Sequence, residues 1–233
     1  MLKIPEVTEM RTSNTFVVDS QRIEIPKWIG NLESFRHWAR SDEFPETGRI
    51  CYLNDELWVD MSKEQVFSHN QVKAEIGSVL FMFAKAARLG RYFPDGVLIS
   101  NERANLSSQP DGTFASYESL SKERLILVPG VVEGFVELEG TPDMVLEIVS
   151  ASSVEKDTET LRTLYWKAGI REYWLVDARG DKLTFDILRH AAKGYIATPK
   201  TSGWTKSAVF GKSFRLRRTK DEQGNPELTL ETK

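Results

Sequence analysis

A single glutamate interrupts an apolar run in the second half of the sequence. Residues 141–153 read TPDMVLEIVSASS, and the neighbours of Glu147 are Leu146 and Ile148. An ionised carboxylate in such surroundings is costly to remove from water unless a cation compensates its charge. The residue types therefore indicate either a ligand of a bound metal ion or the acidic half of an internal ion pair with lysine or arginine.

A metal ion at Glu147 needs a second ligand from another strand. In a strand over 143–149, Asp143 and Glu147 share a face but lie roughly 13 Å apart, at about 3.3 Å per residue. Asp111, in the segment QPDG at 109–112, supplies a carboxylate from a neighbouring strand. Two such carboxylates suit a hard cation such as Mg2+, which activates water and neutralises charge on a phosphate. Because Pro-Asp-Gly also favours turns, a turn role for Asp111 is the alternative.

Hydrophobic periodicity predicts the elements that must position these acids. Helices are expected at 28–41 with Asn31 as N-cap, at 66–88 and at 156–169. Strands are expected at 48–61, where Asn54 and Asp55 indicate a hairpin turn, and then at 96–100, 123–128, 135–139, 143–149 and 171–177. Short strands with glycine turns follow. This order predicts an α/β (α+β) fold, a mixed sheet flanked by helices with an additional N-terminal hairpin and a C-terminal β meander.

Composition bounds the remaining possibilities. The 233 residues are interpreted as a flexible N-terminus (1–14), one domain (15–220) and a C-terminal tail (221–233). A net charge of -3 and a pI near 5.8 argue against coating nucleic acid by bulk charge. The single cysteine, Cys51, excludes an internal disulfide framework. The sequence shows no apolar run long enough to span a bilayer and no signal-peptide core, so we expect a cytoplasmic protein without membrane partners.

The motifs together resemble a known family. PDG at 110–112, TPDMVLEIVS at 141–150 and YWKAGIREYWLVD at 165–177 resemble the Uma2 family, a branch of the PD-(D/E)XK nuclease superfamily. The resemblance implies a restriction-endonuclease-like core with a phosphodiesterase site at the open edge of its sheet. It also implies DNA as the substrate and Mg2+ or Mn2+ as the cofactor.

The resemblance assigns roles to residues of this sequence. It implies that Asp111 and Glu147 are metal ligands, that Asp143 supports the site or caps a strand, and that Glu75 on the long helix is a further acidic ligand. His69 lies in the apolar stripe of that helix, where a packed, hydrogen-bonded histidine is the main alternative to a ligand. For Glu75, the alternative to a metal ligand is a helix residue that faces solvent.

Two departures from the family pattern affect catalysis. Val149 stands where the superfamily signature has lysine, and Leu161 stands where Uma2-type sequences usually carry one. Lys156 and Arg162 are the candidate replacements, Lys156 being either a catalytic residue or a solvated residue at a helix end. Two functions follow: a Mg2+-dependent DNA endonuclease, or a catalytically degenerate nuclease fold that binds nucleic acid or a protein partner. A homodimer is a further expectation, since a dimer reaches both strands of DNA.

Overall fold

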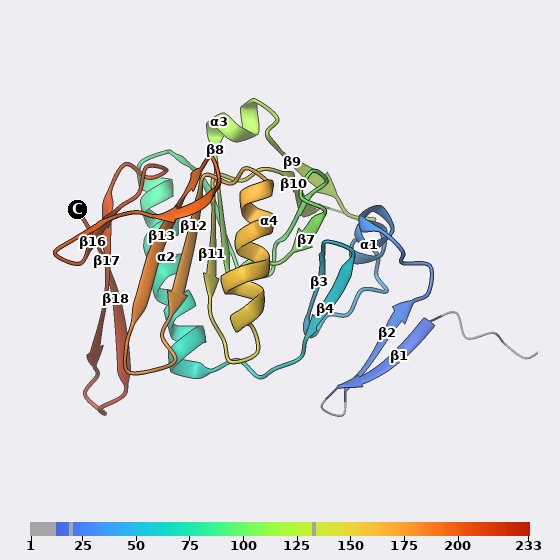
Figure 1. Ribbon diagram of the computed structural model, residues 1–233, viewed down its shortest axis with the longest axis horizontal. Helices are drawn as coiled ribbons and strands as arrows, with labels where there is room; N and C mark the ends of the chain where they lie inside the picture. The colour runs from blue at the N-terminus through green and yellow to red at the C-terminus, as the bar shows by residue number, and fades with distance from the viewer. Residues whose placement is uncertain (1–12, 19–20, 132–133) are drawn as a thin grey trace, which may run out of the picture.

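The computed structural model describes residues 13–18, 21–131 and 134–233 (Figure 1). Most of the N-terminal segment predicted to be flexible, residues 1–12, lies outside these ranges. Residues 13 and 14 begin strand β1 (Ser13–Val18), which pairs antiparallel with β2 (Gln21–Pro26). Among the described residues, no helix is both long and apolar enough to cross a membrane.

The central sheet carries β11 (Met144–Ile148) near its middle. β11 runs parallel to β12 (Glu172–Asp177) and antiparallel to β8 (Gly112–Ser116). The sheet order is β14-β13-β12-β11-β8-β5, completed by β13 (Thr184–Ala191), β14 (Gly194–Ala197) and β5 (Gly90–Pro94). The mixed sheet with helices on its faces confirms the predicted α+β class.

Both faces of β11 are buried, which explains its nearly continuous apolar sequence. Met144, Leu146 and Ile148 point into one hydrophobic core, which includes residues of helix α2 (Gln71–Ala86). Val145 points into a second core, which includes residues of helix α4 (Leu161–Lys167). The two helices thus cover opposite faces of the sheet (Figure 1), and the predicted alternation along β11 is confirmed.

A second sheet lies beside the first and contributes the predicted hairpin. β3 (Arg49–Leu53) and β4 (Glu56–Asp60) pair antiparallel around Asn54 and Asp55, whose φ angles are 52° and 70°. Positive φ at both turn residues is the conformation that a two-residue hairpin requires. The sheet order is β4-β3-β7-β6-β10-β9, with β7 (Leu106–Ser108), β6 (Leu98–Asn101), β10 (Phe135–Gly140) and β9 (Leu125–Pro129).

Two helices begin with a widened π-helical turn. Turn η1 (Val66–Asn70) leads into α2, and turn η2 (Lys156–Thr160) leads into α4. The predicted helices at 66–88 and 156–169 are therefore present, each with a wide first turn. The remaining helices are α1 (Leu32–Ala39), capped by Asn31 as predicted, and the short α3 (Tyr117–Ser121). π-helical turns are rare and are frequently found at functional sites.

The C-terminal residues form a sheet of their own. Its order is β15-β16-β17-β18, with β15 (Lys200–Thr201), β16 (Trp204–Lys206), β17 (Ser213–Lys220) and β18 (Pro226–Thr232). The segment 221–233, interpreted from the sequence as a tail, contains β18. Leu228 and Leu230 of this strand are buried in the α2 core, so the alternation in ELTLET marks a half-buried strand.

Candidate active site

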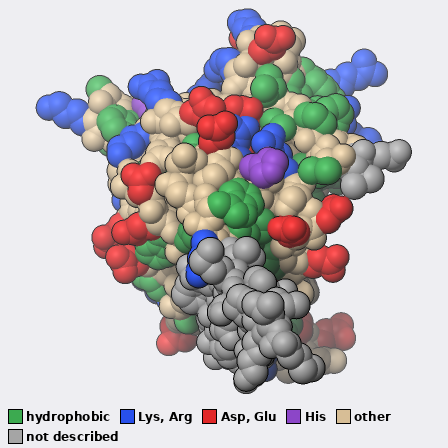
Figure 2. Space-filling view, turned by 90° about the vertical axis from the view of Figure 1, so that its right-hand side faces the viewer, with side chains coloured by type: hydrophobic (Ala, Val, Ile, Leu, Met, Phe, Trp, Pro, Cys, Tyr) green, Lys and Arg blue, Asp and Glu red, His purple; other side chains and the backbone are tan. Residues whose placement is uncertain are grey.

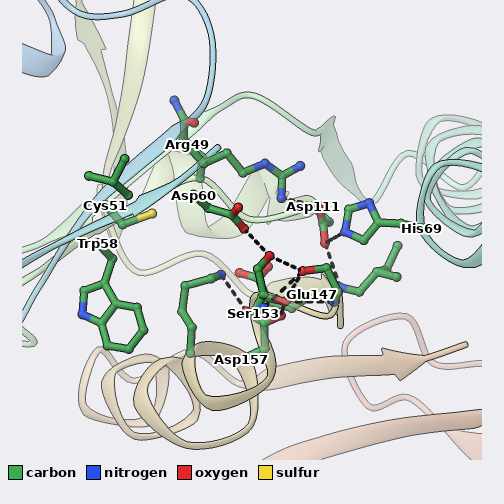
Figure 3. A pocket seen from close by; sticks show the side chains of 15 residues that line it. Arg49, Cys51, Trp58, Asp60, His69, Asp111, Glu147, Ser153 and Asp157 are labelled. Atoms are coloured by element: carbon green, nitrogen blue, oxygen red, sulfur yellow. Dashed lines mark hydrogen bonds and ion pairs between the residues drawn. The ribbon is translucent and has the colours of Figure 1, made fainter. Parts of the chain in front are cut away.

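A small pocket lies between the β3-β4 hairpin and the carboxyl end of β11 (Figure 3). Three strands (β3, β4 and β11), the residue before β8 and the two π-helical turns all contribute to its lining. Its charged and ionisable lining residues include Arg49, His69, Asp111, Glu147, Lys156 and Asp157. Elements that are far apart in the sequence therefore bring both acids and bases to one opening.

Asp111 is held beside β11 by the strand register. Gly112 pairs with Leu146, so the preceding aspartate lies next to the end of β11, and the Ile148 N–H donates to Asp111 Oδ2 at 2.7 Å. The residue is 1% exposed. Arg49 Nη1 lies 2.9 Å from Oδ1, and His69 Nε2 lies 3.4 Å from Oδ2. Although burial opposes it, His69 and Arg49 hold the pKa of Asp111 well below its usual range.

The two oxygens of the Asp111 carboxylate have different partners. Arg49 is close to Oδ1 but is not aligned to donate to it, and among the described residues this buried oxygen has no hydrogen-bond donor. Figure 3 shows Arg49 and His69 approaching the Asp111 carboxylate from two sides. An ionised oxygen without a donor is suited to a cation, because a bound ion satisfies it more fully than a misaligned guanidinium.

Glu147 shares the pocket but has the opposite electrostatics. It is 1% exposed, and the Tyr165 hydroxyl on α4 donates to its Oε1 at 2.6 Å. Burial raises the pKa of Glu147 to about 8, with Lys156 opposing this effect and the charges of Asp157 and Asp111 adding to it. The charge of this glutamate is therefore incompletely compensated by the protein's own residues.

Turn η2 places Lys156 in the same pocket. Its Nζ lies 2.6 Å from Asp157 Oδ1, and Ser153 Oγ donates to Asp157 Oδ2 at 2.5 Å. Burial opposes protonation, but Glu147 and Asp157 raise the pKa of Lys156 above its ordinary value. The ammonium is thus a fixed positive charge beside Glu147, and its side chain is only 13% exposed. Lys156 is not a solvated residue at the helix end.

The structure does not bring Asp143 to the pocket. It lies at the other end of β11, where Ser116 N and Ser119 Oγ donate to its Oδ2 at 2.8 and 2.6 Å. Arg124 and Arg171 also lie 3.3 and 3.4 Å from Oδ1. These contacts connect β11 to the start of α3, so Asp143 has a structural setting.

Glu75 and Arg162 also lie elsewhere. The Leu230 N–H of β18 donates to Glu75 Oε1 at 2.8 Å. Strand β18, which lies in the segment interpreted from the sequence as a tail, covers the edge of α2 that carries Glu75. Arg162 donates to the carbonyl oxygen of Tyr195 in β14 at 3.1 Å. Of the two candidate replacements for the missing lysine, only Lys156 lines the pocket.

Sequence reasoning missed Arg49, and it weighed His69 mainly as a packing residue. His69 is buried as expected, with Nδ1 3.0 Å from Glu64 Oε1, but its other nitrogen faces Asp111. Burial opposes protonation of this histidine, yet Asp111 and Glu64 raise its pKa. Nothing local in the sequence marks Arg49, because its partner is brought close only by the packing of one sheet against the other.

The donor set fits a hard cation with few protein ligands. No three His, Cys, Asp or Glu side chains of the described ranges form a metal-binding group. Mg2+ commonly uses only one or two carboxylates and keeps several waters. Asp111 Oδ1, which has no hydrogen-bond donor among the described residues, and Glu147, whose ionised form the protein compensates incompletely, therefore fit such an ion.

Comparisons with known proteins show the family of this chain and support a nuclease. The profile of the Uma2 family, described as "Putative restriction endonuclease", matches residues 32–216. The chain belongs to the Uma2 family, which confirms the resemblance found in the sequence. A solved structure described as a putative nuclease belonging to DUF820, from Anabaena variabilis ATCC 29413, has a TM-score of 0.57 at 17% identity. The match covers 78% of this chain and 90% of that chain, and it supports the fold. No curated protein matched.

Proposed function

We propose that the protein is a metal-dependent endonuclease that hydrolyses DNA phosphodiester bonds, with Asp111 and Glu147 holding Mg2+ or Mn2+. The observation that carries this proposal is the meeting of two buried carboxylates at one pocket, one on β11 and one directly before the neighbouring strand β8. Family membership supports the nuclease class, the resemblance to this family implies DNA as the substrate, and the two carboxylates of the pocket support the metal.

The two carboxylates have complementary roles. Asp111 is ionised and oriented by the Ile148 amide, so it is ready to act as a ligand. Glu147 becomes a good ligand when a cation replaces its proton, and Tyr165 fixes the direction of its Oε1. When bound, the ion supplies Lewis acidity toward the phosphate and lowers the pKa of a coordinated water.

Lys156 has an electrostatic role in this proposal. Its raised pKa keeps the ammonium charged, which makes it a poor general base and a good stabiliser of negative charge that develops on the phosphate. Asp157 orients it, and Ser153 in turn holds Asp157. Lys156 therefore supplies the positive charge that Val149 and Leu161 do not.

DNA binding would depend on local contacts near the pocket. Figure 2 shows Lys and Arg side chains interspersed with Asp and Glu over the visible face, without a uniform basic surface. This agrees with the net charge of -3. We therefore expect modest affinity for bulk DNA and a contribution of the metal site to substrate binding.

Plasmid nicking tests the proposal. We expect Mg2+- or Mn2+-dependent nicking by the wild type, a loss of at least about a hundredfold in Asp111→Asn and Glu147→Gln, and unchanged activity in Glu155→Gln. Glu155 is a matched control because it is exposed and precedes η2. Full activity in both site variants, with folding verified by circular dichroism, would refute the assignment of Asp111 and Glu147 to the active site.

The second function is a catalytically degenerate nuclease fold that binds nucleic acid or a protein partner. The absence of lysine at positions 149 and 161 favours it. Metal binding that depends on Asp111 and Glu147, without cleavage of any plasmid form, would support this alternative. A homodimer stays a prediction that sedimentation velocity can test.

A further inference from the structure

Arg49 connects the pocket to an acidic residue outside its lining, Asp95. It is the first residue of β3, and its side chain is 28% exposed. Nη1 lies 2.9 Å from Asp111 Oδ1, and Nη2 lies 2.9 Å from Asp95 Oδ2. One guanidinium therefore bridges a fully buried carboxylate and a partly exposed one.

The inner contact occupies the oxygen that a metal ion would need. Asp111 Oδ1 has no aligned hydrogen-bond donor among the described residues, so its compensation comes from the nearby guanidinium charge. A divalent cation and a guanidinium repel each other when both approach one carboxylate oxygen. A bound ion and the present position of Arg49 are therefore in competition.

The contact with Asp95 gives Arg49 a charged partner that it keeps when it leaves Asp111. Asp95 also lies 2.6 Å from Lys73 Nζ, and Lys73 forms an ion pair with Glu64 as well. This arrangement anchors Asp95 to α2 independently of Arg49. A guanidinium released from Asp111 would keep one charged partner and would gain water, so its release leaves no buried unpaired charge.

We propose that Arg49 is an exchangeable internal cation of this site. It holds Asp111 in the metal-free protein. When a divalent ion binds Asp111, Arg49 leaves that oxygen, stays tethered to Asp95, and presents its planar donors to a phosphate of the substrate backbone. Guanidinium groups pair with phosphate oxygens through two parallel hydrogen bonds, which a lysine does not reproduce. The inference rests on the proposed function in one respect, the assignment of Asp111 as a metal ligand.

Metal binding measured without DNA tests the exchange. In calorimetric titrations with Mn2+, Arg49→Ala should bind the ion about tenfold more tightly than the wild type, because no charge-assisted contact has to be broken first. Arg49→Lys should fall between the two. Arg189→Ala is the charge-matched control, since Arg189 is exposed on β13, and it should bind Mn2+ like the wild type.

Thermal unfolding gives a second readout. Arg49→Ala should melt at a lower temperature than the wild type in EDTA, because Asp111 loses its neighbouring cation, and it should gain more from added Mn2+. Binding of a duplex oligonucleotide, measured by fluorescence anisotropy in Ca2+, should weaken in Arg49→Ala. Tighter metal binding together with weaker DNA binding is the signature of the exchange.

The measurements distinguish a failure of the proposed exchange from a failure of the proposed metal site. Equal or weaker Mn2+ binding by folded Arg49→Ala overturns the exchange, whereas Mn2+ binding that is absent or insensitive to Asp111→Asn overturns the proposed metal site instead. If Arg49→Ala does not fold, Arg49→Lys and Asp95→Asn replace it. Asp95→Asn should weaken Mn2+ binding in the wild-type background and have a smaller effect beside Arg49→Lys. An equal effect in both backgrounds contradicts the tether.

Discussion

The pH dependence of stability tests the environment of Glu147 directly. The perturbation is Glu147→Gln, studied without metal. Burial raises the pKa of Glu147 to about 8, against an ordinary value of 4.5. At ~1.4 kcal/mol for each pKa unit, the ionised carboxylate costs the fold on the order of 5 kcal/mol. A glutamine at this position avoids that cost at every pH.

The sign of the effect follows from proton linkage. Between pH 4.5 and about 8 the folded state keeps the Glu147 proton and the unfolded state has lost it. The favourable contribution of this group is therefore complete below pH 4.5 and disappears as pH rises toward 8. Because Asp111 has a lowered pKa, its contribution changes in the opposite sense and falls away only in acid.

The assay is urea unfolding in EDTA from pH 5 to pH 9. We expect the free energy of unfolding of the wild type, relative to that of Glu147→Gln, to decrease by several kcal/mol across this range. Glu155→Gln should change with pH as the wild type does. Saturating Mg2+ at pH 8 should stabilise the wild type by about 3 kcal/mol at a hundred times its Kd, and Glu147→Gln much less. Parallel curves for wild type and Glu147→Gln would refute the reasoning, because they would mean that Glu147 is ionised at no cost in the fold.

Three further predictions concern the residues around β11 and α2. Lys156→Met should lower nicking at least about a hundredfold while Mn2+ binding persists, measured by initial rates and calorimetry; loss of binding alone would contradict an electrostatic role. Asp143→Asn should destabilise the fold by about 2 kcal/mol, from urea unfolding, and should leave Mn2+ affinity unchanged, since its partners are structural. Glu75→Ala should cost about 1 kcal/mol through the lost bond to Leu230 N, with wild-type nicking per folded molecule; a loss of metal binding would place Glu75 in the site after all.

The sequence predicted an element well where a few neighbouring residues determine that element. Asn31 caps α1 through a hydrogen bond with Ser34, and Asn54 and Asp55 adopt the positive φ that their hairpin requires. The alternation along β11 follows from two cores on opposite faces, which the apolar run already indicated. These features depend on a few neighbouring residues, and so a single sequence contains them.

The composition of the site depends on contacts between distant segments, and it was predicted only in part. Asp111 and Asp143 both follow a proline and both neighbour β11, but the strand register places one at each end of that strand. Glu75 looked available because nothing in the helix pattern shows that β18 returns to cover it. Arg49 reaches Asp111 across the boundary between two sheets, a contact that no local pattern encodes.

The wide turn η2 explains how Lys156 reaches the pocket when position 161 is leucine. In this turn the Leu161 N–H bonds to the Lys156 carbonyl oxygen, so residues five apart lie one turn above the other. Leu161 is fully buried in the α4 core, and Lys156 lies one turn nearer to the end of β11. An ordinary helical turn would align position 157, and not position 156, with Leu161. Lys156 and Asp157 both line the pocket, so the wide turn brings a cation there beside a third carboxylate, and spacing rules based on a regular helix therefore gave Lys156 weak support.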